Sequence, residues 1–298
     1  MDLLQNLIQG ISLGSVYAII ALGYTMVYGI AKMLNFAHGD VIMVGAYVSF
    51  IFVQSTQSAL GAFAPVAALV ISMALCTVLG ITIERLAYKP LRQAASLAVL
   101  ITAIGMSYLL QNAAQLIWGS APKTVSNLIT LAPISLADGA LTISWDTLLT
   151  IVVNIVIMLT LTWFTSSTKT GRAMRAVSED KGAAELMGIN VNRTISLTFA
   201  IGSALAAVAG VLYCSYSHTL TPTTGSIPGI NAFAAAVFGG IGSIPGALLG
   251  GILLGLIEIL SNSYISTQLG NTFVFVVLII VLLVKPAGLL GKQMREKV

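Results

Sequence analysis

Three polar side chains in one short interval could line or gate a path through a membrane. Asn35, His38 and Asp40 lie in the sequence Asn-Phe-Ala-His-Gly-Asp, between two long apolar runs. Ionisable side chains are costly inside a bilayer, so they are usually paired or placed where they act on a solute. For Asn35 and His38 a structural role is equally open, because both could satisfy backbone groups freed by a helix break. For Asp40 we favour a cap on the helix that follows.

Glu258 is the only acidic residue that we place inside an apolar span, in the sequence Leu-Leu-Gly-Leu-Ile-Glu-Ile-Leu-Ser-Asn. A lone carboxylate there needs a hydrogen-bond donor, a cation or water. It could contact the ammonium group of a substrate or hydrogen-bond to a neighbouring helix, and its place near the end of the span would also let it reach the interface. We therefore treat Asn35, His38 and Glu258 as candidates for a translocation path, and Asp40 as a helix cap or gate.

The glycine-rich sequence Gly239-Gly-Ile-Gly-Ser-Ile-Pro-Gly246 does not end like a nucleotide-binding loop. A P-loop ends in Gly-Lys-Ser/Thr, whereas the only Gly-Lys pair, Gly291-Lys292, is followed by Gln293. We find no nucleophile elbow, zinc motif or paired-carboxylate motif, and we expect no cofactor and no metal. The chain therefore has no recognisable ATP site and is not expected to be an enzyme.

The composition indicates a membrane protein. Only 8% of the 298 residues are charged and 57% are hydrophobic, against roughly 25% charged in ordinary globular chains. These charges are too few to cover a soluble surface. The net charge of +4 does not indicate nucleic-acid binding, because the basic residues flank the apolar runs. We expect an all-α, polytopic membrane protein with a single transmembrane domain over residues 1–298 and no cleaved signal peptide.

Apolar runs of membrane length predict about eight transmembrane helices. The predicted spans are 3–31, 41–54, 61–83, 96–118, 145–166, 195–214, 246–261 and 271–284. The stretch 231–261 is too long and too glycine-rich for one plain helix, so we expect a broken or re-entrant helical hairpin there. In the first span, Gly10 and Gly14 form a GxxxG pair that would allow close helix packing. One such pair can also arise by chance among 28 glycines.

The basic residues predict the orientation of the spans. Thirteen of the fourteen lysine and arginine residues fall in four flanks, at Lys32, 85–92, 169–193 and 285–297. If the connections alternate, and the turn at Gly239–Gly246 returns to the same face, all thirteen lie on one face. The positive-inside rule assigns that face to the cytoplasm. The N-terminus would then lie outside.

The longest polar interval, residues 168–197, predicts an amphipathic cytoplasmic helix. At 100° per residue, the small and apolar side chains fall on one arc. This arc consists of Ala173, Ala176, Val177, Ala183, Ala184 and Met187. Asp180 interrupts the arc, and Gly188 is placed to end the helix at its C′ position. The interval is either a docking surface for another subunit or a helix that lies on the membrane.

Four stretches together resemble the LivH-type permease of high-affinity branched-chain amino acid importers, which belong to the ATP-binding-cassette transporters. They are residues 10–50, 84–92, 171–212 and 237–262, and they include the Asn-Phe-Ala-His-Gly-Asp and Gly-Gly-Ile-Gly-Ser-Ile-Pro-Gly-Ala sequences. The resemblance covers most of the chain and is weakest over 119–144. Close relatives that carry urea or short amides share these sequences, so the resemblance does not fix the substrate.

Within the polar interval, Ala183-Ala184, Gly188 and Ile195 are similar to the loop through which importer permeases bind their ATPase subunits. The sequence departs from that pattern because Asp180-Lys181 precede the Gly-Ala-Ala and no proline follows Leu197. The resemblance implies that this coupling segment, residues 168–197, contacts an ATPase. The residues implied in the contact are Arg172, Ala173, Val177, Glu179, Ala183, Ala184, Met187 and Gly188.

The resemblance also implies the activity and the partners. The chain would move leucine, isoleucine and valine inward across the bacterial cytoplasmic (inner) membrane by alternating access. Its partners would be a second homologous permease, two cytoplasmic ATP-binding subunits and an external, periplasmic substrate-binding protein. A permease for urea or short amides is one alternative. A self-contained secondary transporter is another, but only Glu258 and Asp40 could serve it as ion-coupling residues.

Overall fold

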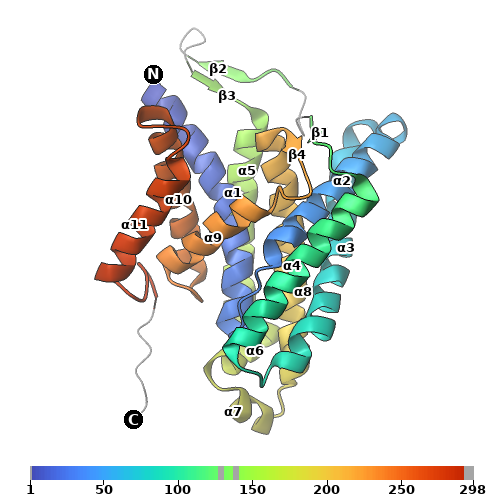
Figure 1. The fold of residues 1–298 in the computed structure, drawn as a ribbon, viewed down its shortest axis with the longest axis vertical. Helices are drawn as coiled ribbons and strands as arrows, with labels where there is room; N and C mark the ends of the chain where they lie inside the picture. Colours follow the sequence, from blue (N-terminus) through green and yellow to red (C-terminus); the bar gives the residue numbers. More distant parts are fainter. Residues whose placement is uncertain (1, 127–130, 137–140, 292–298) are drawn as a thin grey trace.

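The computed structural model describes residues 2–126, 131–136 and 141–291. In these residues the chain is almost entirely helical, as the sequence predicts, and the helices form one elongated bundle (Figure 1). Two pairs of short strands lie at the end of the bundle that holds the N-terminus. Helices α6 and α7 lie at the opposite end.

Seven of the described helices are long and apolar enough to cross a membrane. They are α1 (Asp2–Ala31), α2 (His38–Leu60), α3 (Ala64–Ile83), α4 (Ser96–Trp118), α5 (Trp145–Ser167), α8 (Val191–Ser217) and α10 (Ile244–Tyr264). Two shorter apolar helices are α9 (Ser226–Gly239) and α11 (Gly270–Val284). Helix α9 is the expected half-helix of a broken hairpin, and α11 occupies the last predicted span.

The remaining elements connect these helices. Helix α3 continues into a π-helical turn (Glu84–Tyr88) and a 3-10 turn (Lys89–Leu91). A further 3-10 turn, Gly61–Phe63, precedes α3. The helices α6 (Lys169–Glu179) and α7 (Lys181–Leu186) link α5 to α8. Strand β1 (Lys123–Thr124) pairs antiparallel with β4 (Thr219–Leu220), and β2 (Ile134–Leu136) pairs antiparallel with β3 (Leu141–Ile143).

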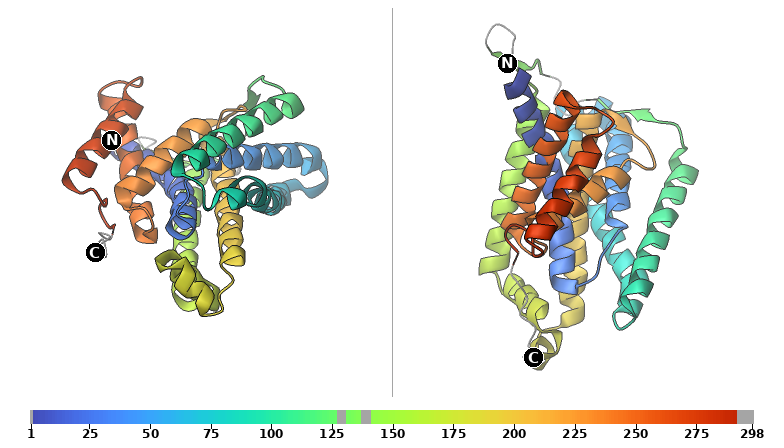
Figure 2. Two further views of the ribbon diagram at one scale, coloured as in Figure 1. Left: turned by 60° about the horizontal axis from the view of Figure 1, so that its bottom comes forward. Right: turned by 60° about the vertical axis from the view of Figure 1, so that its left-hand side comes forward.

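Helix α1 forms the centre of the bundle. Most of its side chains are buried, and it packs against α5, α8, α9 and α10. Helices α3, α4, α5 and α11 lie further out (Figure 2), and they carry many of the large exposed apolar side chains. Exposed leucine, isoleucine and valine side chains on a helix of membrane length fit a lipid environment.

Glycine contacts bring α1 and α10 close together. The predicted pair Gly10 and Gly14 on α1 faces a second GxxxG pair, Gly251 and Gly255, on α10. A Cβ atom added to Gly14 would lie 2.7 Å from the Cα atom of Ile252, closer than side chains pack. The pair in the first span is therefore a packing motif rather than a chance pattern.

The described residues place the basic flanks at one end of the bundle. Gly29, near the end of α1, packs against Gly242 in the hairpin turn between α9 and α10. Lys181 of α7 reaches the last residue of α1, Ala31. This arrangement agrees with the alternating connections from which the orientation of the spans was predicted. The assignment of this end to the cytoplasm stays a prediction, and residues 292–298 with their three basic side chains lie outside the described residues.

Candidate functional site: buried polar positions and the coupling segment

The first candidate residues lie at a helix break inside the bundle. Helix α1 ends at Ala31, Lys32 adopts a left-handed φ of 58°, and residues 33–37 are not helical before α2 begins at His38. Asn35, His38 and Asp40 are all buried. The break therefore runs through protein, the setting in which non-helical backbone is tolerated at membrane depth.

His38 is locked at the crossing of α1 and α2. Its ring lies directly over Gly23, so that a Cβ atom there would collide with the imidazole. The Tyr24 ring contacts the imidazole edge-on, with ring centroids 4.7 Å apart. Nε2 of His38 is buried and has no hydrogen-bond partner among the described residues. In this conformation His38 is part of a helix crossing and does not line an open passage.

Asn35 links the break to the segment that follows α3. Its Oδ1 accepts a hydrogen bond of 2.9 Å from the Tyr88 hydroxyl. The Tyr88 ring packs against Phe199 of α8, with centroids 5.3 Å apart. A displacement of the Glu84–Tyr88 turn would therefore act on the helix break through one buried hydrogen bond.

Asp40 does not cap α2, so that prediction is wrong. The N-cap position is Ala37, which makes no side-chain cap bond. Because the helix begins earlier than the hydropathy pattern suggests, Asp40 lies in its first turn, and Oδ1 accepts a 2.9 Å hydrogen bond from Gln111 of α4. Gln111 also contacts Ser107 and Ser226, at 3.2 and 3.4 Å. Asp40 thus joins α2 to α4 and to the start of α9.

Glu258 takes part in a hydrogen-bond network that joins four helices. Its Oε2 accepts hydrogen bonds from the Tyr17 hydroxyl of α1 at 2.9 Å and from Asn231 of α9 at 3.2 Å. Asn231 also donates to Asn271 of α11 at 2.9 Å. Glu258 is not the only acid in a span, since Asp40 lies within α2. The polar residues Tyr17, Asn231 and Asn271 were not predicted, although each interrupts an apolar run.

The coupling segment is two helices rather than one. Asp180 breaks the predicted helix, because its side chain accepts hydrogen bonds from the backbone N–H groups of Gly182 and Ala183 and so begins α7. Aspartate is among the strongest N-cap residues. At the other end of α7, Gly188 has a φ of 79° and occupies the predicted C′ position. The backbone N–H groups of Gly188 and Ile189 donate to the carbonyl oxygens of Glu185 and Ala184, respectively, and these two bonds form a Schellman motif.

The predicted small-residue arc is consequently divided between two environments. Val177 and Ala184 are buried against the protein's own bundle, together with Met174. The prediction that Val177 and Ala184 belong to one docking surface is therefore wrong. Arg172, Glu179, Ala183 and Gly188 are exposed, and Ala173 is half-buried. Leu186 and Met187 are 90% and 83% exposed, so they form an apolar tip at the end of α7.

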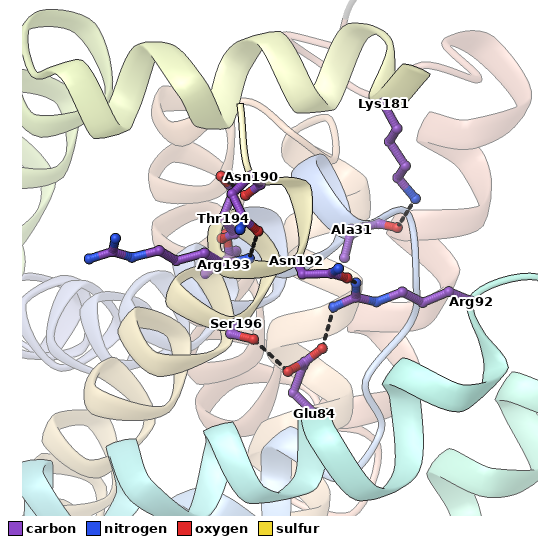
Figure 3. A network of polar contacts seen from close by, with 10 residues as sticks. Ala31, Glu84, Arg92, Lys181, Asn190, Asn192, Arg193, Thr194 and Ser196 are labelled. Carbon is purple, nitrogen blue, oxygen red and sulfur yellow. Dashed lines mark hydrogen bonds and ion pairs between the residues drawn. The ribbon is translucent and has the colours of Figure 1, made fainter. Parts of the chain in front are cut away.

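A polar cluster holds the coupling segment to the membrane helices (Figure 3). Glu84, fully buried at the end of α3, pairs with Arg92 and accepts a 2.7 Å hydrogen bond from Ser196 of α8. Arg92 also donates to Asn192 near the start of α8. The contact between Glu84 and Arg92 is the one ion pair among the described residues. It was not predicted, because Glu84 and Arg92 read as flanking charges in the sequence.

Lys181 joins the same region to α1. Its Nζ donates a 2.9 Å hydrogen bond to the Ala31 carbonyl oxygen. Partial burial lowers the pKa of Lys181, and the nearby charges of Arg92 and Lys32 lower it further. The negative end of the α1 dipole and the accepting carbonyl oppose this effect by stabilising the ammonium group. The ammonium group thus connects α7 to the residue that precedes the helix break.

These features together define a multi-pass membrane transport subunit. They are the bundle of membrane-length helices, the buried polar positions at a helix break and the exposed segment at one end of the bundle. A family model described as "Branched-chain amino acid transport system / permease component" matches residues 6–282. The chain belongs to this family of permease components. It is therefore a transport subunit rather than an enzyme, and a multi-pass protein of the inner membrane.

Curated relatives support this assignment over the whole chain. The chain is 45% identical to the high-affinity branched-chain amino acid transport system permease protein LivH of Salmonella typhimurium, over 99% of this chain and 97% of the relative. It is 44% identical to LivH of Escherichia coli K12, with the same coverage. It is 46% identical to BraD of Pseudomonas aeruginosa, a protein described in the same words, over 99% and 98% of the two chains.

Proposed function

We propose that the chain is one permease of an ATP-driven importer that moves leucine, isoleucine and valine inward by alternating access. The relatives named above are permease proteins of branched-chain amino acid transport systems, which supports this substrate class. The partners proposed are a second homologous permease, two cytoplasmic ATP-binding subunits and an external substrate-binding protein. In this assembly, ATP hydrolysis belongs to the partner subunits.

The observation that carries the proposal is the direct contact between the coupling segment and the membrane helices. An ATPase that bound the apolar tip of Leu186 and Met187 would pull on α7. Lys181 of α7 would pass this force to Ala31, the last residue of α1. Since α1 is central to the bundle, a displacement of its end would affect the surrounding helices.

A second connection leads from the coupling segment to the helix break. The start of α8 is tied to Glu84, the first residue of the π-helical turn after α3, and to Arg92, which follows that turn. Tyr88 of that turn donates to Asn35. π-Helical turns are rare and are frequent at functional sites. We infer that the Glu84–Tyr88 turn changes shape during transport and moves Asn35 with it.

Charge at the apolar tip is expected to uncouple the permease from its ATPase. A Leu186→Glu/Met187→Glu variant should insert and fold normally, because both side chains are almost fully exposed and pack against little. It should lose ATPase co-purification and at least 90% of ATP-dependent leucine uptake in proteoliposomes, since a carboxylate in an apolar contact is strongly unfavourable. Co-purification and uptake measured on the same preparation test this expectation.

Two controls make the tip experiment specific. Leu186→Met/Met187→Leu keeps an apolar tip and should retain coupling. Lys123→Glu changes the charge of a strand at the opposite end of the bundle, and it should retain coupling as well. Normal ATPase co-purification with the glutamate variant would overturn the proposed role of the tip. Leucine uptake by the chain alone, without ATP or partners, would instead support a secondary transporter.

If Glu258 contacts the substrate, its charge is expected to affect leucine uptake more than its hydrogen bonds do. Glutamine at position 258 keeps an oxygen that can accept from Tyr17 and Asn231, so a Glu258→Gln variant should unfold at the wild-type temperature. We expect leucine uptake to fall by about tenfold, equivalent to about 1.4 kcal/mol, because the carboxylate no longer attracts the ammonium group of the amino acid.

Comparison with Glu258→Leu separates the two roles of this residue. Leucine removes the acceptor and the charge together, so it should lower both thermal stability and uptake. If Glu258→Gln retained normal uptake while Glu258→Leu did not, the carboxylate would be a structural link between α1, α9 and α10. That outcome would remove Glu258 from the proposed translocation path.

A further inference from the structure

A hollow with a basic lining lies between the turns that follow α3 and the beginning of α8. Its volume is about 430 Å³. Arg85 lines it from the π-helical turn after α3, and Lys89 lines it from the 3-10 turn that follows. Residues of the other wall are Asn190, Asn192, Arg193 and Ser196. The hollow is open to the surroundings, and its three basic side chains are exposed.

Within the described residues, these three cations have no carboxylate partner. The one ion pair in the described part of the chain joins Glu84 to Arg92, so no described carboxylate lies within ion-pair distance of Arg85, Lys89 or Arg193. The lining also contains the first residues of α8, a helix of 27 residues. The positive end of a helix dipole adds to the local potential there. The hollow therefore favours an anion.

The back of the hollow is held by hydrogen bonds among its own residues. The Asn190 side chain accepts from the backbone N–H of Arg193 and caps α8. Asn192 accepts from Arg92, and Ser196 donates to the buried carboxylate of Glu84 at 2.7 Å. A wall fixed in this way does not need to become ordered when an anion binds, which lowers the entropic cost of binding.

The hollow opens at the edge of a lipid-facing surface. Along α3 and the π-helical turn that continues it, four exposed residues follow one another at helical spacings of three and four: Leu75, Val78, Thr82 and Arg85. This stripe passes from apolar to basic as α3 approaches its end. Leu86, beside Arg85, is 75% exposed. Apolar side chains on one side and cations on the other match the acyl chains and the headgroup of a phospholipid.

We propose that this hollow binds the phosphate of an anionic phospholipid headgroup, such as phosphatidylglycerol, from the membrane leaflet at the end of the bundle that carries α6 and α7. The lipid would be held by Arg85, Lys89 and Arg193 and would lie against the ion-pair cluster that connects α3 to α8. The proposal concerns a site of this chain alone and does not depend on the transported substrate.

Removal of the three charges tests the site. Wild-type chain and an Arg85→Gln/Lys89→Gln/Arg193→Gln variant are purified in detergent and titrated with phosphatidylglycerol, phosphatidylcholine or inorganic phosphate, with bound lipid counted by native mass spectrometry. Each basic residue near an anionic lipid contributes about fivefold in affinity. We therefore expect the triple variant to bind phosphatidylglycerol about 100-fold more weakly, and phosphatidylcholine to bind both proteins weakly.

A matched variant separates this site from net charge. Lys169→Gln/Arg172→Gln/Lys285→Gln removes three exposed cations elsewhere on the described surface and should keep wild-type affinity for phosphatidylglycerol. Equal loss in the two triple variants would overturn the proposal. If the first triple variant did not fold, each single variant should still lower the affinity about fivefold, and unchanged affinity in all three would overturn it.

Two further outcomes would assign the hollow to another ligand. Inorganic phosphate that competed with phosphatidylglycerol at equal concentration would indicate a free-anion site and would overturn the lipid assignment. Unchanged lipid binding combined with loss of ATPase co-purification would indicate an acidic surface of a partner subunit. Saturable binding of phosphatidylglycerol that only the wild type and the matched variant show is the result expected.

Discussion

A Gly255→Val variant is expected to lose the folded form of the protein. Gly255 of α10 lies against the backbone of Gly14 of α1, so that even one added carbon atom would overlap the Gly14 backbone. Backbone atoms in a helix cannot move aside alone, and the two helices would have to separate along their length. Because α1 is the centre of the bundle, this separation would disturb its contacts with several helices.

The expected loss of stability in Gly255→Val follows from the free-energy cost of overpacking. Extra methyl groups in a packed interior typically cost about 1–3 kcal/mol, and a clash with backbone on both helices lies at or above the upper end. We expect the detergent-solubilised variant to elute as aggregate on size-exclusion chromatography and to accumulate poorly in membranes. Gly14→Val and Gly251→Val should behave in the same way.

Gly105→Val is the matched control for this experiment. Gly105 also lies inside a membrane-length helix, α4, but an added Cβ atom there would meet nothing within 4 Å. The same substitution should therefore leave the elution profile unchanged. A monodisperse Gly255→Val protein with normal thermal stability would contradict the close approach of α1 and α10.

The helices and their order could be predicted from the sequence because the bilayer imposes a simple rule. Long apolar runs must form helices that satisfy their own backbone groups, and the predicted spans accordingly fall on helices in the described residues. The break in 231–261 was predictable for the same reason, since Gly239–Gly246 contains a proline and four glycines. Helix ends were less predictable, because α2 and α8 extend beyond the apolar runs into polar residues.

The candidate site was predicted only in part, because its geometry depends on contacts between distant residues. Asp40 was expected to bond locally as a cap, but its partner Gln111 is 71 residues away. Likewise, no local pattern indicates that Glu84 is buried or that Ser196 lies beside it. The break at Asp180 is different, since an aspartate before Lys-Gly-Ala-Ala could have been read as an N-cap.

An Arg92→Met variant is expected to show the largest loss of stability among the polar substitutions. The partner carboxylate of Glu84 is fully buried, and methionine would leave it without a cation. Removal of one partner of a buried ion pair typically costs about 3–5 kcal/mol, because the remaining charge stays in a poorly solvated position. The loss should appear as a lower midpoint of thermal or denaturant unfolding of the detergent-solubilised chain.

The double variant Glu84→Gln/Arg92→Met distinguishes an ion pair from simple packing. Glutamine is neutral and can still accept from Ser196, so the buried charge disappears while this hydrogen bond stays. We expect the double variant to recover most of the stability that Arg92→Met loses, which means that the two substitutions are strongly non-additive. Lys169→Met, at an exposed position of α6, should leave the unfolding midpoint unchanged. Additive losses at positions 84 and 92 would show that Arg92 acts through its contacts with α8 rather than through the charge of Glu84.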